Sequence, residues 1–335
     1  MTKTQKIGII GAGAWGCALA IAFERAGFEI LIWSFETDVR DQINQNHENK
    51  TYLQDHKLSP RIKATSSFAD FEDFTTLLLV CPTQHISTIS KELYQFIDPK
   101  TLIVICSKGV DIKSAKLPSE LLHDINPNAN LAILSGPSFA RDVALNLPTA
   151  LTFAYADNKK GLEFCKEFAT KTFRPYWSDD IIGAQIGGAI KNIIAIGCGI
   201  ILGKKWGDNA RAALITRGLN EMAQLSHIMG GKPQSLMGLA GIGDLTLTCN
   251  SLESRNMSLG YALGQGQSLA DYIQDKKTVC EGLKTVEAIP ALKAKYPELD
   301  MPTCEALYEV LIKGASIDQT LNGLLSRPIK EEILY

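Results

Sequence analysis

The segment 6–16, KIGIIGAGAWG, constrains the fold more than any other part of the chain. An apolar strand pattern runs directly into G-x-G-x-x-G and then into a helical pattern, which is the βαβ setting that a dinucleotide-binding turn requires. Gly11 permits the tight turn, Gly13 lets a pyrophosphate approach the backbone, and Gly16 lets the helix pack closely on the strand. The helix N-terminus attracts the phosphate charge. The pattern predicts a nucleotide site, against the alternative of a glycine-rich turn without a ligand.

Apolar runs alternate with amphipathic stretches over the first half of the chain. Runs rich in Ile, Val and Leu on both faces are typical of a parallel sheet that is covered by helices. The predicted strands are 6–10, 29–33, 76–80, 101–105, 131–134 and 149–154, and the predicted crossover helices lie around 15–26, 85–96 and 116–124. This order predicts an α/β, Rossmann-type doubly wound sheet.

The strand signal stops after about Trp177, and helical patterns follow. The predicted helices are 180–202, 209–229, 254–263, 282–295 and 303–312. A chain of 335 residues favours two domains, at about 150 residues per domain. We therefore expect a dinucleotide-binding Rossmann domain over 1–180 and an all-α substrate and catalytic domain over 181–335.

Composition excludes several classes of protein. The net charge is −2 and no Lys/Arg run is longer than a pair, which argues against a nucleic-acid partner. The eight cysteines lack CxxC pairs and nearby histidines at ligand spacing, so no metal site is expected. Most of them lie in apolar stretches, as expected for reduced thiols. Because the N-terminal residues also lack a long apolar signal region, we expect a cytoplasmic protein.

The stretch 181–202 has the length of a membrane-spanning helix. Lys191 lies at its middle, and a charge at the bilayer centre costs at least ~3 kcal/mol. We therefore expect no membrane span, and a helix that is buried between domains instead. Gly187, Ile194 and Ala195 surround Lys191 on the helix, so burial should lower its pKa and let it exchange a proton near neutral pH, as carbonyl reduction requires. The alternative is a lysine that extends to solvent.

Polar residues follow two apolar strands, at the sheet edge where doubly wound folds bind ligands. Lys108 follows the strand that ends near Ile105, and the run SGPSFA at 135–140 follows the next strand. Farther along, Asp244 is a candidate to orient or balance Lys191, and Arg255 offers a fork suited to phosphate. Each of these residues alone is also compatible with an ordinary surface position.

Seven segments together carry a family resemblance. They are GAGAWG at 11–16, KG at 108–109, SGPSFA at 135–140, GGAIKNIIAIG at 187–197, ARAALITRGLNEM at 210–222, GLAGIGDLTLTC at 238–249 and SRN at 254–256. In this order they resemble the bacterial NAD(P)-dependent glycerol-3-phosphate dehydrogenases over nearly the whole chain. The resemblance implies reversible NAD(P)H-dependent reduction of dihydroxyacetone phosphate to sn-glycerol 3-phosphate, which supplies the backbone of membrane phospholipids.

The resemblance also implies roles for individual residues. Lys191 would be the residue that transfers the proton. The implied substrate pocket consists of Lys108, Gly136, Ser138, Asn192, Asp244, Thr248, Ser254, Arg255 and Asn256. The cofactor contacts that it implies, beside Gly11, Gly13 and Gly16 of the glycine motif, are Ala14, Trp15, Phe35, Lys108, Ala140, Arg255, Val279 and Glu281.

Two positions depart from the family pattern. Ala14 stands where many relatives have Ser, and Phe35 stands where NADPH-preferring relatives often have His or Arg. Glu36 after the second strand suits the ribose hydroxyl of NADH, whereas Arg40 one turn later suits a 2′-phosphate. A surface i,i+4 pair between Glu36 and Arg40 is the third interpretation. The sequence alone leaves the choice between NADH and NADPH open.

Two other functions are compatible with parts of the sequence. Another two-domain dehydrogenase, of the hydroxyacid or ketopantoate type, would share the nucleotide domain and the lysine in the long helix, but SRN and GDLTLTC argue against it. A nicotinamide-binding protein without turnover is disfavoured by the four residues Lys108, Lys191, Asp244 and Arg255. The apolar second domain favours a homodimer, and the sequence does not decide whether the product regulates the enzyme.

Overall fold

The computed structural model describes residues 5–275 and 280–329. The chain divides into two compact units, one formed by Met1–Ser107 with Pro118–Ile181 and the other by Lys108–Leu117 with Ile182–Tyr335. The short segment Lys108–Leu117 therefore belongs with the residues that follow Ile181. The predicted domains 1–180 and 181–335 stay a prediction. A single boundary near residue 180 does not account for the segment Lys108–Leu117, which belongs to the second unit.

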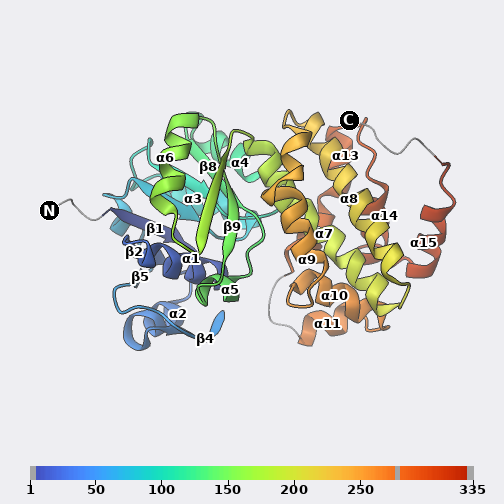
Figure 1. Ribbon diagram of the computed structural model, residues 1–335, viewed down its shortest axis with the longest axis horizontal. Coiled ribbons are helices and arrows are strands. Elements are labelled where there is room, and N and C mark those ends of the chain that lie inside the picture. Colours follow the sequence, from blue (N-terminus) through green and yellow to red (C-terminus); the bar gives the residue numbers. More distant parts are fainter. Residues whose placement is uncertain (1–4, 276–279, 330–335) are drawn as a thin grey trace. The chain divides into compact units, whose positions relative to one another are not determined.

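An eight-stranded sheet forms the first unit (Figure 1). In spatial order its strands are β10 (Phe173–Ser178), β9 (Thr149–Tyr155), β8 (Asn130–Ser135), β7 (Leu102–Ile105), β6 (Thr76–Leu79), β1 (Lys6–Ile10), β2 (Glu29–Trp33) and β5 (Lys63–Thr65). Strand β1 pairs with β2 on one side and with β6 on the other, so the order of the strands reverses between β1 and β6. Doubly wound sheets bind ligands at the carboxyl ends of the strands beside such a reversal.

The strands from β5 to β8 are parallel, as predicted for β1, β2, β6, β7 and β8, whereas no strand was predicted at β5. Strand β9 runs antiparallel to β8, and β10 then pairs parallel with β9. The predicted parallel direction of 149–154 is therefore wrong. The connection between β8 and β9 contains only the five-residue helix α5 (Ala140–Ala144), which is too short to carry the chain back along the sheet.

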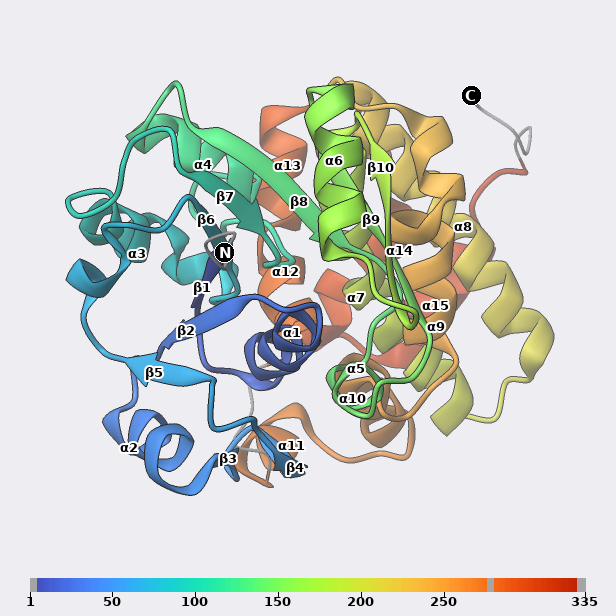
Figure 2. The same cartoon turned by 60° about the vertical axis from the view of Figure 1, so that its left-hand side comes forward.

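Helices cover the sheet of the first unit. They are α1 (Ala14–Arg25), α2 (Thr37–Asp41), α3 (Ile86–Leu93), α4 (Pro118–Ile125), α5 and α6 (Asn158–Phe168), and a hairpin of β3 (Glu48–Asn49) and β4 (Leu53–Lys57) lies outside the main sheet. Helix α1 packs on α5, α3 packs on α4, and α6 lies along β9 and β10 (Figure 2). A continuous core joins side chains of α1, α5 and α6 to alternate residues of the strands, so burial on this face fixes the sheet register.

The described part of the second unit is helical apart from its loops. Its helices are α7 (Ile181–Gly203), α8 (Asp208–Ile228), α9 (Asp244–Cys249), α10 (Arg255–Gly264), α11 (Leu269–Asp275), α12 (Glu281–Glu287), α13 (Ile289–Lys295), α14 (Pro302–Leu311) and α15 (Ile317–Leu325). The single helix predicted over 282–295 is two helices, because Pro290 has no N–H and so begins a new helix in its first turn. A π-helical turn, Leu239–Gly243, leads directly into α9.

Helix α7 is the centre of this second core. By length and composition it could cross a membrane, but 94% of its most apolar window is buried inside the protein. Its isoleucines pack against side chains from α8, α10, α12 and α14. The helix is therefore apolar because it packs in the core of the second unit.

Candidate active site

The glycine turn lies at the carboxyl end of β1, where the strand order reverses. Gly11 has φ = +127°, a conformation that L side chains rarely adopt, and a Cβ there would lie 3.1 Å from the carbonyl carbon of Val80. The Gly11 N–H donates to the carbonyl of Trp33 over 3.1 Å. A Cβ on Gly16 would collide with the carbonyl oxygen of Gly11. The turn therefore requires glycine at both positions.

The first turn of α1 has the properties of a phosphate site. Gly13 is its N-cap, and neither a capping side chain nor an acidic residue occupies this end of the helix in the described structure. A Cβ on Gly13 would meet no described atom within 4 Å, so the space beside the backbone is open. The buried Nε1 of Trp15 has no hydrogen-bond partner among the described residues. The predicted residues Gly11 to Gly16, Ala14 included, thus fit the pyrophosphate of a dinucleotide.

The residues after β2 are arranged differently from the i,i+4 interpretation. Phe35 is 80% exposed, which leaves its ring available to a ligand. The Glu36 carboxylate accepts a hydrogen bond of 2.8 Å from the hydroxyl of Tyr52. Arg40 pairs instead with its neighbour Asp41, at 2.8 Å. The interpretation that the side chains of Glu36 and Arg40 pair with each other is therefore wrong, because each side chain has a different partner.

The SGPSFA run begins at the last residue of β8. Gly136 has φ = +148°, and a Cβ there would lie 3.1 Å from the Cα of Leu151. The Ser138 hydroxyl donates to the carbonyl of Gly136 over 2.9 Å, and Ala140 begins α5. The structure thus places the three predicted contact residues Gly136, Ser138 and Ala140 just beyond a strand's carboxyl end, and their roles stay predictions.

A buried carboxylate in the second unit holds two ammonium groups. Lys191 Nζ lies 2.5 Å from Asp244 Oδ1, and Lys108 Nζ lies 2.7 Å from Asp244 Oδ2. Lys191 also donates to the Thr248 hydroxyl over 2.8 Å, and that hydroxyl donates to the backbone carbonyl of Asp244 over 2.7 Å. Asp244 is 1% exposed and Lys191 is 6% exposed. Four of the predicted residues are thus brought together by direct contacts.

Local packing explains why Lys191 meets Asp244. A Cβ on Gly187 would collide with the carbonyl of Ala240, so this glycine lets α7 approach the π-helical turn Leu239–Gly243 at backbone distance. Lys191 is one turn beyond Gly187 on α7, and Asp244 is one turn beyond Ala240. Close approach at the glycine therefore sets the two charged side chains opposite each other.

The two lysines of this cluster have opposite pKa shifts. Burial lowers the pKa of Lys191 to about 8, with the Asp244 charge opposing that shift and the Lys108 charge adding to it. Burial also acts to lower the pKa of Lys108, but Asp244 and then Glu281 outweigh it and raise that pKa above its ordinary value. Lys108 therefore stays charged, while Lys191 is able to exchange a proton near neutral pH.

A chain of side-chain amides extends from the lysine cluster. Asn256 Nδ2 donates to Asn192 Oδ1 over 2.9 Å, and Asn192 Nδ2 lies 3.4 Å from Glu281 Oε2. The Asn256 Oδ1 accepts the N–H of Gly282 at 3.0 Å and the thiol of Cys280 at 3.0 Å. Glu281, predicted as a cofactor contact, is therefore tied to two predicted substrate residues. The sequence carried no signal for Cys280 or Gly282, because nothing local marks their contact with Asn256.

Arg255 begins α10 at the edge of this network. Its side chain is exposed and pairs with no carboxylate over residues 5–275 and 280–329. Ser254, the N-cap, accepts the N–H of Met257 at 3.3 Å. Ser254 thus fixes the start of the helix, and Arg255 is a cation available to an anionic ligand. Val279, the remaining predicted contact, lies outside the described residues.

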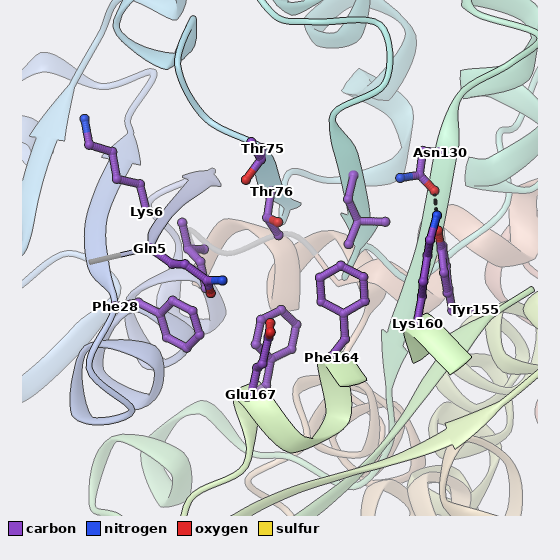
Figure 3. Close-up of a pocket in the computed structure, with 13 residues that line it drawn as sticks. Gln5, Lys6, Phe28, Thr75, Thr76, Asn130, Tyr155, Lys160, Phe164 and Glu167 are labelled. Carbon is purple, nitrogen blue, oxygen red and sulfur yellow. Dashed lines mark hydrogen bonds between the residues drawn. The ribbon is translucent and has the colours of Figure 1, made fainter. Parts of the chain in front are cut away.

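A cavity of about 340 Å³ lies at the opposite edge of the first unit's sheet (Figure 3). Its lining includes the first residues of β1, β6, β7 and β8 together with side chains of α6. The Tyr155 hydroxyl donates to Asn130 there, over 2.7 Å. Because dinucleotides bind at the carboxyl ends of the strands, this cavity is separate from the glycine turn. Over the described ranges, no group of three or more potential metal-ligating side chains occurs.

The fold and the candidate site residues define a class of protein. A doubly wound sheet with a glycine turn at its reversal, joined to a helical unit with a buried Lys–Asp–Lys cluster, is the organisation of a nicotinamide-dependent dehydrogenase. Residues 6–161 match the NAD-dependent glycerol-3-phosphate dehydrogenase N-terminus and residues 180–322 match the C-terminus of the same family. The chain belongs to the glycerol-3-phosphate dehydrogenase family.

Individual relatives agree with this assignment. The glycerol-3-phosphate dehydrogenase [NAD(P)+] of Maricaulis maris is 45% identical over 332 residues, which cover 99% of each chain. The crystal structure of glycerol-3-phosphate dehydrogenase from Coxiella burnetii superposes with a TM-score of 0.92 at 37% identity, and covers 97% of this chain and 99% of that one. A ketopantoate reductase from Ralstonia eutropha reaches a TM-score of 0.58 at 13% identity over 95% of this chain and all of its own, which shows a shared fold alone.

Proposed function

We propose that this chain catalyses the reversible NAD(P)H-dependent reduction of dihydroxyacetone phosphate to sn-glycerol 3-phosphate, and so supplies the glycerol backbone of phospholipids. The observation that carries the proposal is the buried contact of Lys191 and Lys108 with the Asp244 carboxylate. Reduction of a ketone needs a proton donor and positive charge at the oxygen, and this cluster contains both.

A bound NAD(P)H supplies the hydride that reduces the ketone carbon. Lys191 is proposed to donate a proton from Nζ to the oxygen that becomes the hydroxyl. With a pKa of about 8, most of this lysine is protonated at neutral pH, and it is a stronger acid than an ordinary lysine. In the reverse direction the neutral amine would accept the same proton. Asp244 and Thr248 hold Nζ in place by the two hydrogen bonds described above.

Lys108 is proposed to stabilise the negative charge that develops on the same oxygen. Its raised pKa keeps it charged over the pH range in which Lys191 titrates. A fixed charge inside a buried cluster needs no reorganisation during the reaction, so its stabilisation is larger than it would be in water. Lys108 thus complements the proton donor without exchanging a proton.

Arg255 is proposed to bind the phosphate of the substrate. Its exposed guanidinium carries several donors in a fork that matches phosphate oxygens. Ser254, Asn256 and Asn192 are proposed to hold the substrate nearby, because their hydrogen bonds connect the start of α10 with the helix that carries Lys191. Binding energy at the phosphate then orients the carbonyl. Gly136 and Ser138 are kept as proposed substrate contacts on the family resemblance.

The nicotinamide dinucleotide is proposed to bind through its pyrophosphate to the turn Gly11–Gly16 and the first turn of α1. The open space beside Gly13 and the uncapped helix end support this placement. Phe35 offers an exposed ring to the adenine. The further proposed contacts of the dinucleotide are Ala140, Lys108, Arg255, Val279 and Glu281. No metal is proposed for the reaction.

Initial-rate kinetics with the purified chain test the proposed function. We expect dihydroxyacetone phosphate to be reduced with kcat/KM within the usual range for enzymes, about 10⁴–10⁸ M⁻¹s⁻¹. Ketopantoate, 2-oxo acids and unphosphorylated dihydroxyacetone serve as competing substrates. A higher kcat/KM for any of these than for dihydroxyacetone phosphate contradicts the proposal.

A homodimer in the cytoplasm is the proposed state of the protein. Several large apolar side chains of the second unit are exposed, among them Met237 at 68% and Leu252 at 48%, which supports an association surface. All eight cysteines are free and seven of them are buried, as suits a reducing compartment. Light scattering after size-exclusion chromatography measures the mass, and a monomer at micromolar concentration contradicts the dimer.

A further inference from the structure

We propose that this enzyme selects NADH over NADPH, because Glu36 is held at the carboxyl end of β2 to accept hydrogen bonds from the adenosine ribose and to repel a 2′-phosphate. This inference rests on the proposed function in one respect, that a nicotinamide dinucleotide binds at the glycine turn. It assigns specificity to Glu36 and positioning roles to Tyr52 and Asn49.

Glu36 stands where dinucleotide-binding folds read the ribose. In these folds an acid at the end of the second strand accepts a hydrogen bond from the ribose 2′-hydroxyl, and a basic residue there accommodates a 2′-phosphate. Strands β1 and β2 end in register, with Ile10 opposite Trp33. The Ser34 hydroxyl donates to the backbone carbonyl of Glu36 over 2.8 Å, which fixes the turn just beyond the strand.

The Glu36 carboxylate itself is oriented by Tyr52. The tyrosine hydroxyl donates to Oε1 over 2.8 Å, which leaves the carboxylate's remaining lone pairs as acceptors. The pKa of Tyr52 is raised, first by this hydrogen bond to Glu36, as expected where the hydroxyl faces an ionised acid. A carboxylate held in one orientation loses less side-chain entropy when a ribose binds to it.

Asn49 connects this carboxylate to the phosphate-binding turn. Its side chain is fully buried; Nδ2 donates to the carbonyl of Ala12 over 2.8 Å, and Oδ1 accepts the N–H of Tyr52 at 3.1 Å. Hydrogen bonds therefore run without interruption from the glycine turn through Asn49 and Tyr52 to Glu36. The positions that would meet the pyrophosphate and the ribose are thus fixed relative to each other within the first unit.

Arg40, the basic residue nearest to Glu36 in the sequence, already has a counter-ion. Arg40 Nε donates to Asp41 Oδ1 over 2.9 Å, and a terminal nitrogen of the same guanidinium lies 2.8 Å from that oxygen. A 2′-phosphate at this place would meet the Glu36 carboxylate and an arginine that already has a counter-ion. Phe35 adds no charge. The balance of charges therefore opposes NADPH, and repulsion of the wrong ligand is an effective source of specificity.

Calorimetric titration of the full-length chain with NADH and NADPH measures the preference without turnover. We expect the Kd for NADH to be at least about tenfold lower than that for NADPH, because a like charge a few ångströms away is costly near a protein surface. Glu36→Gln should bring the two values to within about threefold by weakening NADH and strengthening NADPH binding. The fragments ADP and adenosine 2′,5′-bisphosphate should show the same order.

Two more variants separate position from charge. Tyr52→Phe should bring the Kd values for NADH and NADPH partly closer together. Its thermal midpoint should stay within about a degree, because an exposed hydrogen bond contributes little to stability. Glu29→Gln, at the other end of β2, is the matched control and should leave the ratio unchanged. Equal or tighter binding of NADPH to the unaltered protein, or an unchanged ratio in Glu36→Gln, overturns the inference.

Failure of this inference and failure of the proposed function give different results. Reduction of dihydroxyacetone phosphate by a protein that binds NADPH more tightly overturns the NADH preference and leaves the function standing. Preferential NADH binding by a protein that does not reduce this ketone overturns the proposed substrate and supports the role of Glu36. Binding of neither dinucleotide overturns the inference together with the proposed cofactor.

Discussion

Lys191 and Asp244 form a buried ion pair in which 2.5 Å separates the lysine Nζ from Oδ1. The carboxylate is not saturated by this contact, since its other oxygen holds Lys108 at 2.7 Å. Two cations thus share one anion inside the protein. The net positive charge of this cluster is what distinguishes it from a purely structural salt bridge, because a neutral pair would offer nothing to an oxygen that gains negative charge.

The pH dependence of the reaction should report Lys191. The protonated lysine is the donor for ketone reduction, so kcat/KM for dihydroxyacetone phosphate should be constant below the pKa of about 8 and fall about tenfold per pH unit above it. Oxidation of glycerol 3-phosphate needs the neutral amine and should rise with pH toward a plateau above 8. Initial rates in both directions at fixed ionic strength check this. A reduction rate that rises through pH 8 would exclude Lys191 as the donor.

Replacement of Asp244 by Asn should shift the fall of kcat/KM for ketone reduction to lower pH. The Asp244 charge raises the pKa of Lys191, so its removal leaves burial and the Lys108 charge to lower the pKa further. It also removes the carboxylate that two buried ammonium groups share, at a cost in stability of about 3–5 kcal/mol. Rate profiles and thermal midpoints of the variant measure both effects. Asp318→Asn, which removes an exposed partner of Lys204, is the control and should change neither.

Lys191 could be singled out from the sequence because a charge in the middle of an apolar helix is anomalous in any environment. Strands β1 and β2 were predicted with the correct bounds for a similar reason, since short apolar runs between helices have few alternatives. Both predictions depend on local pattern. The same is true of the glycine turn, whose φ of +127° at Gly11 only glycine adopts without strain.

The features that the sequence did not predict depend on contacts between distant segments. Asn49 looks like an ordinary polar loop residue, and only the folded chain brings its amide to the carbonyl of Ala12. The antiparallel direction of β9 depends on how far a five-residue helix can carry the chain. Lys108 was expected at a sheet edge, but the segment it begins belongs to the second unit. None of these has a local periodicity that could reveal it.

Replacement of Arg255 by Ala should selectively impair the phosphorylated substrate. Loss of a charged hydrogen bond of about 1.5–3 kcal/mol corresponds to a decrease in kcat/KM of roughly 10- to 150-fold for dihydroxyacetone phosphate. Unphosphorylated dihydroxyacetone, which lacks the anion, should be reduced at the same slow rate by both proteins. Arg327→Ala removes an arginine that already pairs with Asp300 and should have no effect on either substrate. Equal losses on both ketones would refute the phosphate role.

Replacement of Gly260 by Ala should destabilise the second unit. A Cβ on this α10 residue would collide with the carbonyl of Ile196 on α7, and backbone cannot yield as a flexible side chain can. Overpacking of this kind costs about 1–3 kcal/mol or more. Gly323→Ala is the control on α15, where an added Cβ meets no described atom within 4 Å, and should stabilise by about 0.5–1 kcal/mol. Thermal unfolding of the two variants compares them directly, and equal midpoints would refute close packing of α7 on α10.

Glu221 should make the stability of the second unit depend on pH. This α8 carboxylate is 4% exposed and accepts the backbone N–H groups of Thr303 at 2.7 Å and Cys304 at 3.1 Å. It thereby caps α14, whose own N-cap Met301 provides no side-chain acceptor. Burial raises the pKa of Glu221 to about 7, against an ordinary value of 4.5, with the bonds to Thr303 opposing the shift.

The sign of the effect follows from proton uptake. Between pH 4.5 and 7 the folded protein holds a proton on Glu221 that the unfolded chain has lost, so the contribution of this group to stability falls as pH rises through that window and is constant above it. Glu221→Gln cannot ionise. The free energy of unfolding of the variant relative to the unaltered protein should therefore increase by up to about 3 kcal/mol from pH 4.5 to 8. Urea denaturation at both pH values measures the difference. A constant difference would show that Glu221 ionises equally in the folded and unfolded chain.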